Sequence, residues 1–205
     1  MGKVSATGSF HLFVGVATST IIMAVGTIIL ARLLSRAEYG LYSVALIPSL
    51  MINLFRDWGV NSAIAKYIAH SRVTKKEEDI RDIIAAGLIF EIATGLALSL
   101  LSLFLAGFIA STVFHDPESA SLISIVSITI FSGSLLTASQ YSFIGFERME
   151  FNSITIICQA VVKSVLSPLL VLLLGYGALG AVLGYTFSFL LASITGLTML
   201  YFLLF

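Results

Sequence analysis

Residues 119–146 read SASLISIVSITIFSGSLLTASQYSFIGF, a run of apolar and small residues that contains no formal charge. A helix needs about 20 mostly apolar residues to cross the hydrocarbon core of a bilayer. An uncharged apolar run longer than this is typical of a transmembrane helix. We therefore expect residues 119–146 to cross a membrane.

Five further runs share this length and apolar character. The third contains Glu91 as its only charge, the fifth contains only Lys163, and the sixth contains none. We predict an all-α fold, a polytopic membrane helix bundle that forms a single transmembrane lobe over residues 1–205. Its six predicted transmembrane helices are residues 10–34, 40–66, 83–110, 119–146, 151–174 and 178–205.

The composition supports this class and excludes several others. Hydrophobic residues make up 58% of the 205 residues and charged residues only 11%, whereas a soluble domain has about 25% charged residues. A water-soluble globular domain is therefore excluded. Eleven Lys and Arg balance eleven Asp and Glu, so there is no basic excess for a nucleic-acid partner.

Motifs for catalysis and metal binding are missing from the sequence. Its single cysteine and three widely separated histidines lack the spacing of metal ligands. It contains neither a phosphate-binding P-loop nor a nucleophile elbow. We therefore predict no catalytic residue, no metal, no cofactor and no enzymatic activity.

The distribution of basic residues predicts the orientation, because cytoplasmic loops are enriched in Lys and Arg. With a cytoplasmic N-terminus, only two basic residues near helix ends lie outside, Arg32 and Arg36. We therefore predict a multi-pass protein of the cytoplasmic membrane with both ends inside. The basic residues then placed inside are Lys3, Lys66, Arg72, Lys75, Lys76, Arg81 and Arg148.

Three charges fall deep inside the second and third predicted helices, where a charge is costly and often functional. Arg56 and Asp57 are adjacent in sequence and so do not face each other on a helix. Arg56 and Glu91 lie at nearly equal distances from the turn centred near residues 73–74, so they are expected to meet across the helix pair. Two interpretations stay open for them: a buried ion pair that sets helix register, or a cation lining an aqueous cavity and held by Glu91. Asp57 and Glu91 are also candidates for cavity lining or ion coupling.

Lys163 lies about 17 Å into the fifth predicted helix, close to the membrane midplane. Asn152, Gln159, Lys163 and Ser167 share one face of that helix. Such a stripe should face a wet cavity or partner helices. Lys163 is thus expected either to line a cavity, with Gln159, or to pair with an acid on an adjacent helix.

Gln140 lies near a polar face of the fourth predicted helix that also carries Ser134, Thr137 and Tyr141. Small hydroxyl residues are common at helix contacts in membranes. The pattern is therefore compatible with helix packing as well as with a cavity, and Gln140 is a weaker candidate.

Three stretches of the chain resemble Wzx-type polysaccharide-biosynthesis flippases, a family of the multidrug/oligosaccharidyl-lipid/polysaccharide transporter superfamily. They are ILARLLSRAEYGLYS at 29–43, LFRDWGV at 54–60 with AKYIA at 65–69, and FIGFERM at 143–149. The resemblance follows the order of the helices over essentially the whole chain.

The resemblance implies one lobe of a two-lobed transporter, the N-terminal half, with a C-terminal lobe missing here. It implies a cationic central cavity that holds the (pyro)phosphate of a polyprenyl-linked oligosaccharide, and membrane lipids as further partners. Arg56 occupies a motif position where related flippases carry basic residues, whereas Lys163 is placed only by its depth and face. The alternatives are a multidrug exporter of the same superfamily, which predicts an acidic cavity, and a non-transporting scaffold of a glycan-assembly complex.

Overall fold

The computed structural model describes residues 2–56, 59–74 and 77–204, and all regular elements in these parts are helical. A short π-helical segment, η1 (Ile109–Val113), follows α4. The α-helices are α1 (Gly2–Leu33), α2 (Arg36–Arg56), α3 (Val60–Thr74), α4 (Glu77–Phe108), α5 (Ser119–Gly145), α6 (Met149–Leu174) and α7 (Gly177–Leu204).

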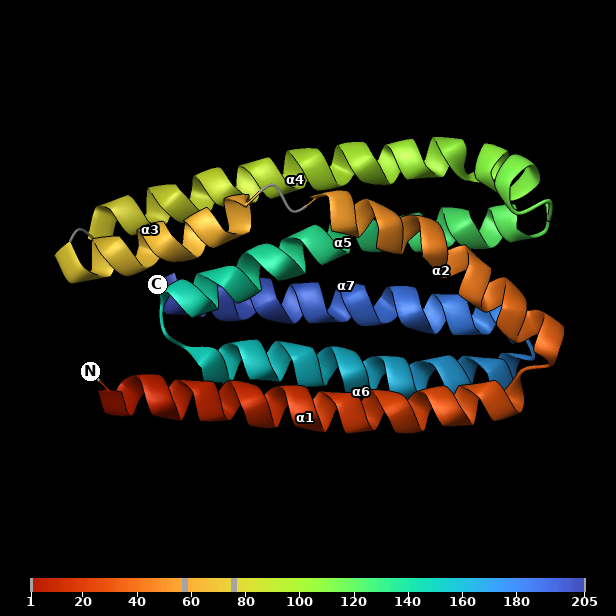
Figure 1. Ribbon diagram of the computed structural model, residues 1–205, viewed down its shortest axis with the longest axis horizontal. Helices are drawn as coiled ribbons and strands as arrows, with labels where there is room; N and C mark the ends of the chain where they lie inside the picture. Colours follow the sequence, from red (N-terminus) through yellow and green to blue (C-terminus); the bar gives the residue numbers. More distant parts are fainter. Residues whose placement is uncertain (1, 57–58, 75–76, 205) are drawn as a thin grey trace.

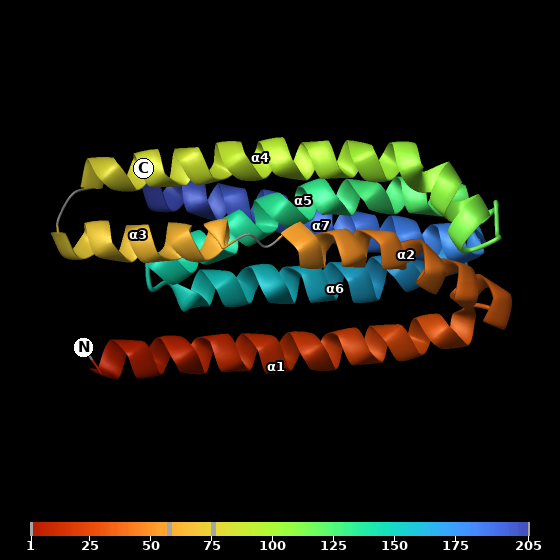
Figure 2. The same ribbon diagram turned by 45° about the horizontal axis from the view of Figure 1, so that its top comes forward.

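The helices lie along one common direction and form an elongated bundle (Figures 1 and 2). Packing proceeds from α1 to α6, from α6 to α7, from α7 to α5 and from α5 to α4. The chain enters at one end of the bundle, and its last helix returns to that same end (Figure 1).

Five helical segments are long and apolar enough to cross a membrane. They correspond to the first, third, fourth, fifth and sixth predicted spans. Their bounds are Phe10–Leu33, Asp79–Val113, Ser119–Gly145, Met149–Leu173 and Gly177–Leu204.

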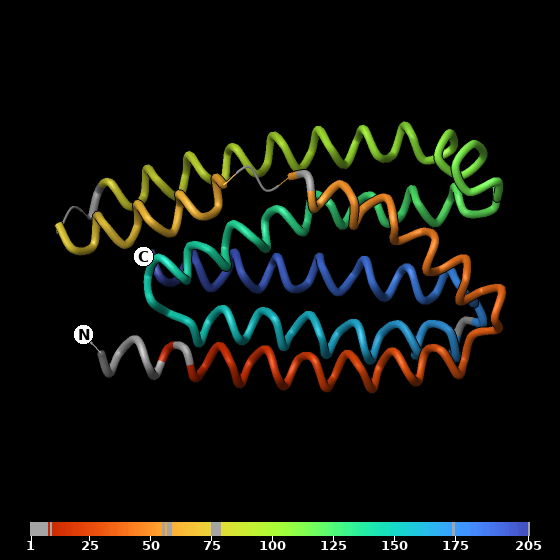
Figure 3. The backbone as a smooth tube through the Cα atoms, viewed as in Figure 1, coloured from red at the N-terminus to blue at the C-terminus, as the bar shows by residue number. Residues whose placement is uncertain are grey.

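The second predicted span, residues 40–66, is wrong as a single helix. α2 ends at Arg56 and α3 begins at Val60, and the two run one after the other beside α4 and α5 (Figure 3). Gly59 has a backbone φ of 80°, a left-handed conformation that ends a right-handed helix and that glycine adopts without steric cost. A glycine shortly after charged residues is a known helix stop signal, so the sequence contained evidence for this interruption.

Helix α1 packs closely against α6 through pairs of glycine and serine. A Cβ atom at Gly15 or Gly26 would collide with Ser153 or Ser164, respectively. The two serine hydroxyl groups donate hydrogen bonds to the backbone carbonyls of His11 (2.8 Å) and Ile22 (3.0 Å) on α1. Small residues thus let the two backbones approach and form hydrogen bonds between helices.

Two apolar clusters fill the two halves of the bundle. One includes Tyr42, Ile123 and Val126, and the other includes Ile68 and Phe143. Along α5, polar residues between positions 133 and 141 separate the two clusters. Arg56, the last residue of α2, contacts Thr137 of α5 at this same level, where the functional site is expected.

The turn between α1 and α2 is a capping box formed by Ser35 and Glu38. The Ser35 backbone N–H donates to Glu38 Oε2 (2.8 Å), and the Glu38 backbone N–H donates to Ser35 Oγ (3.2 Å). Hydrogen bonds from the Ser35 backbone and hydroxyl lower the pKa of Glu38 below its usual value.

Removing this cap should destabilise the junction of α1 and α2. We expect Ser35→Ala to lower the free energy of unfolding by about 1 kcal/mol. Because the folded-state pKa of Glu38 is depressed, its contribution is present at neutral pH and is lost as pH falls through that pKa. The free energies of unfolding of wild type and Glu38→Gln should therefore differ at neutral pH and converge at acidic pH. A difference that grows as the pH falls would contradict the capping role of Glu38.

Candidate functional site

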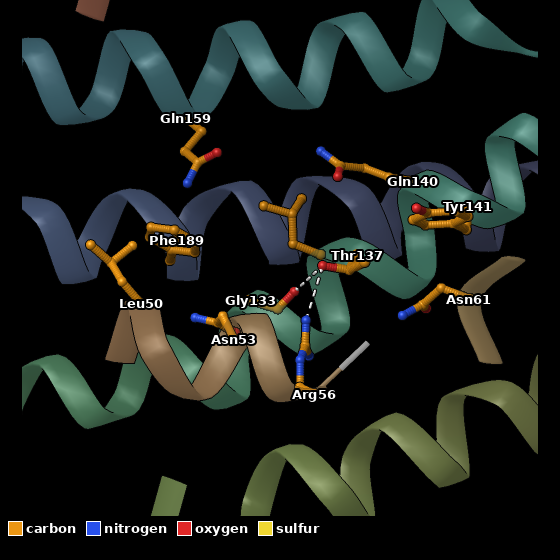
Figure 4. Close-up of a pocket in the computed structure, with 11 residues that line it drawn as sticks. Leu50, Asn53, Arg56, Asn61, Gly133, Thr137, Gln140, Tyr141, Gln159 and Phe189 are labelled. Carbon is orange, nitrogen blue, oxygen red and sulfur yellow. Dashed lines mark hydrogen bonds between the residues drawn. The ribbon is translucent and has the colours of Figure 1, made fainter. Parts of the chain in front are cut away.

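A cavity of about 390 Å³ lies among α2, α3, α5, α6 and α7 at the level of the interruption (Figure 4). This volume is within the range of small-molecule sites, about 300–1,000 Å³. Among the described lining residues, most side chains are polar but neutral, and Arg56 is the charged one. The lining residues are Leu50, Asn53, Arg56, Asn61, Gly133, Leu136, Thr137, Gln140, Tyr141, Gln159 and Phe189.

Arg56 is the last residue of α2 and connects the cavity with α4. Its Nη1 donates to Glu91 Oε2 at 3.0 Å, and its Nη2 donates to Thr137 Oγ1 at 3.3 Å. The Arg56 and Glu91 side chains are 9% and 2% exposed. The predicted meeting of Arg56 and Glu91 is confirmed, whereas the interpretations of the pair stay open because an ion pair at the cavity wall fits both.

Glu91 also binds α3 through its second carboxylate oxygen. Asn61 Nδ2 donates to Glu91 Oε1 at 2.9 Å. Glu91 therefore connects the last residue of α2 with the first turn of α3, across the interruption. The Glu91 backbone carbonyl accepts a hydrogen bond from Ser134 Oγ of α5 at 3.1 Å.

Sequence reasoning did not identify Asn61 as a site residue. It is 4% exposed, and its Oδ1 is buried and has no hydrogen-bond partner among the residues that the structure describes. A continuous second helix would place Arg56 and Asn61 five residues apart and on different faces. Only the interruption between α2 and α3 allows both to reach the same carboxylate.

The amide side chains of the cavity offer both hydrogen-bond acceptors and donors to a ligand. Asn53 Nδ2 donates to the Ser49 carbonyl (2.9 Å), and Gln140 Nε2 donates to Thr155 Oγ1 (3.2 Å). Each of these bonds uses one of the two N–H donors of its amide, so the oxygen atom and the second N–H remain for other partners. Gln159 forms no side-chain hydrogen bond in the described part of the chain, and it points toward the cavity (Figure 4).

Lys163 does not line this cavity, so the structure does not bring the two predicted cations together. Its Nζ lies 5.0 Å from the ring centroid of Tyr185, a cation–π contact. Lys163 lines a separate small crevice with residues of α1. Of the acidic residues that the structure describes, none forms an ion pair with Lys163. The described surroundings of the Lys163 ammonium group are thus the Tyr185 ring and this crevice, away from the cavity that Arg56 lines.

An aromatic pair connects Lys163 indirectly to the cavity. The Tyr185 and Phe189 rings lie 5.1 Å apart on α7, and Phe189 lines the cavity. Gln159, one turn before Lys163 on α6, reaches the cavity itself. Asp57, the remaining candidate, lies outside the described residues.

Over the described residues, no group of three His, Cys, Asp or Glu side chains is arranged to hold a metal ion. The site therefore consists of a buried Arg–Glu pair at the wall of a cavity that is rich in neutral amides. Such a wall combines one cationic group with several hydrogen-bond acceptors.

Comparison with known proteins places the chain in context. A family model described as polysaccharide biosynthesis protein matches residues 5–205. No curated protein sequence matches the chain.

Solved structures share the fold at low sequence identity. A MOP superfamily transporter from Pyrococcus furiosus aligns with a TM-score of 0.78 and 15% identity, over 97% of this chain and 44% of its own. A MATE protein in complex with MaD5 aligns with a TM-score of 0.68 and 15% identity, over 95% of this chain and 44% of its own. The chain thus spans less than half the length of these structures.

Proposed function

Because the chain belongs to the polysaccharide biosynthesis protein family, we propose that it is the N-terminal lobe of a lipid-linked oligosaccharide flippase. The full protein would move polyprenyl-(pyro)phosphate-linked repeat units across the cytoplasmic membrane for the synthesis of cell-surface polysaccharide. A second, C-terminal lobe would complete the central cavity. In this proposal six crossings are made by α1, by α2 with α3, and by α4 to α7, and both ends are cytoplasmic.

The observation that carries the proposal is the combination of Arg56 with neutral amides in one cavity. A guanidinium group binds phosphate through charge-assisted hydrogen bonds. Sugar hydroxyl groups donate hydrogen bonds, and the oxygen atoms of Asn53 and Gln140 accept them. The ring of Phe189 offers an apolar surface to the C–H face of a sugar.

The proposed mechanism is alternating access, in which two lobes rock around a site near the membrane midplane. Arg56 offsets the negative charge of the phosphates while the sugar crosses inside the cavity and the lipid tail stays in the bilayer. Lys163 is proposed as a second cation that acts near the Tyr185–Phe189 pair. Glu91 is the candidate for ion coupling.

Two rival functions make different predictions about the same cavity. A multidrug exporter for cations would need an acidic cavity, whereas Arg56 faces the cavity here and Glu91 lies behind it. A non-transporting scaffold of a glycan-assembly complex would not need the charge of Arg56 or Lys163.

Complementation in cells that lack a known repeat-unit flippase tests the proposal. We expect the full-length protein to restore surface glycan, and Arg56→Ala and Lys163→Ala to abolish it at an equal amount of membrane-inserted protein. Arg56→Gln combined with Glu91→Gln removes both buried charges together and should also be inactive. Arg148→Ala, at an exposed basic residue, is the matched control and should remain active.

Restoration of surface glycan by both single variants would overturn the site assignment and favour the scaffold. If Lys163→Ala retained surface glycan while Arg56→Ala lost it, the substrate site would include Arg56 and not Lys163. This outcome would agree with the separate location of Lys163.

A further inference from the structure

The Glu91 carboxylate has two different partners, one on each side of the α2–α3 interruption. Oε2 accepts from Arg56 and Oε1 accepts from Asn61. Arg56 also lines the cavity, whereas Glu91 is 2% exposed. Any anion that reaches Arg56 from the cavity therefore meets a guanidinium that is already neutralised by a buried carboxylate.

This arrangement makes anion binding depend on the charge of Glu91. With the cavity empty, Arg56 and Glu91 together carry no net charge. An anion on Arg56 adds negative charge beside a carboxylate that is only 2% exposed, and a like charge nearby disfavours the ionised form of a carboxylate. Uptake of one proton by Glu91 removes its negative charge, and Arg56 can then pair with the anion.

Asn61 offers a hydrogen-bond acceptor to the protonated carboxyl group. Its Nδ2 already donates to Glu91 Oε1, and within the described part of the chain its Oδ1 is buried and accepts no hydrogen bond. A protonated carboxyl group is a donor as well as an acceptor, so its O–H can donate to Asn61 Oδ1. The ionised form of Glu91 thus accepts from Arg56 and from Asn61 Nδ2, and the neutral form can in addition donate to Asn61 Oδ1.

In their described parts, the helices packed around Glu91 carry further carboxylates only near their ends, at Glu38 of α2 and at Asp79 and Asp82 of α4. α5 presents the hydroxyl groups of Ser134 and Thr137, and its Tyr141 lines the same cavity. The described titratable residues of α3 (Lys66, Tyr67, His70 and Arg72) and those at the start of α4 (Asp79, Arg81 and Asp82) are exposed. Asp82, the nearest of these on α4, is nine residues away, or about 14 Å along the helix.

We propose that anion binding at Arg56 and proton uptake by Glu91 form one coupled step, so that the cavity takes up a phosphate-bearing ligand together with a proton. The inference rests on the proposed function, which assigns the phosphate to Arg56. It adds that Glu91 competes with the ligand and that Asn61 stabilises the protonated form.

Calorimetry on the full-length protein tests the coupling. The probe is a farnesyl methyl diphosphate diester, because a diester lacks the second phosphate pKa near 6 and keeps its charge over about pH 5–8. Titrations in two buffers with different ionisation enthalpies measure the protons taken up on binding. We expect up to about one proton per bound anion, and an affinity that rises by up to about tenfold for each unit of falling pH.

The sign follows from linkage. A proton that is taken up when the anion binds is part of the complex, so lowering the pH favours the complex. Affinity for the anion therefore rises as pH falls. Glu91→Gln keeps a hydrogen-bonding side chain and should bind the probe with no proton uptake and no pH dependence.

Two controls separate the possible failures. Glu150→Gln changes an exposed glutamate that also pairs with an arginine and should keep the proton uptake of wild type. Asn61→Ala removes both the donor to the ionised form and the acceptor for the neutral form, and should move the pH at which the affinity rises. If Glu91→Gln does not fold, the number of protons that the wild type takes up per bound anion decides whether binding and protonation are coupled.

Binding of the probe without proton uptake by the wild type would overturn the coupling while leaving the proposed function intact. No binding, or binding that Arg56→Gln leaves unchanged, would instead refute the assignment of the phosphate to Arg56 and, with it, the premise of the coupling.

Discussion

Replacing Glu91 with leucine should lower the free energy of unfolding by about 3–5 kcal/mol, because it leaves the buried charge of Arg56 without a carboxylate. The Arg56–Glu91 contact is 3.0 Å long between side chains that are 9% and 2% exposed. Removing both charges should recover most of the loss, since apolar replacements of a buried pair are often neutral. Denaturant unfolding of Glu91→Leu, Arg56→Met and the double variant in detergent measures this difference.

The same experiment addresses the two interpretations of the pair. A large loss of stability in Glu91→Leu that the double variant reverses identifies a structural ion pair. Folded protein of normal stability that no longer exports glycan would indicate that water in the cavity solvates Arg56. Glu150→Leu serves as the control, because its exposed pair with Arg148 should contribute less than about 1 kcal/mol.

Replacing Gly184 with alanine should lower the free energy of unfolding by about 3 kcal/mol, near the upper end for overpacking. A Cβ atom at Gly184 would lie 2.5 Å from both the backbone N and the Cα of Ser167 on α6. Backbone atoms of a packed helix cannot rotate away, so α6 and α7 would have to separate. Gly180, four residues earlier, also faces α6 closely, which is the small-xxx-small arrangement of membrane helix pairs.

Gly107→Ala is the matched control for this prediction. Gly107 lies in α4, and a Cβ atom there would meet nothing within 4 Å. Alanine has the higher helix propensity, so this variant should be neutral or stabilise the protein by up to about 1 kcal/mol. Equal changes in the free energy of unfolding for the two variants would contradict our expectation. They would show that helix propensity, and not close packing, determines the effect at Gly184.

Much of the fold could be predicted from the sequence because membrane helices are specified by local composition. Apolar runs of sufficient length locate five spans, and Ser35 with Glu38 identifies the start of α2. Arg56 and Glu91 could be paired by counting, because helices of a hairpin rise at the same rate from their common turn. Even the interruption had a local signal in Gly59.

The locations of Asn61 and Lys163 could not be predicted in this way. The direction in which a helical side chain points depends on the rotation of the helix about its axis, which packing against neighbours sets. Lys163 shares a face with Gln159 on α6, yet only Gln159 reaches the cavity, since Tyr185 of α7 covers the lysine.

By itself, the sequence determined the all-α class, the apolar spans and the few charges at membrane depth. These follow from hydropathy and helical periodicity, which act over neighbouring residues. Only the tertiary structure decided that Glu91 joins α2 to α3 through Arg56 and Asn61, and that Arg56 and Lys163 occupy separate pockets. The physical reason is that a buried charge takes the nearest group that satisfies it, and contacts between helices far apart in the chain determine which group that is.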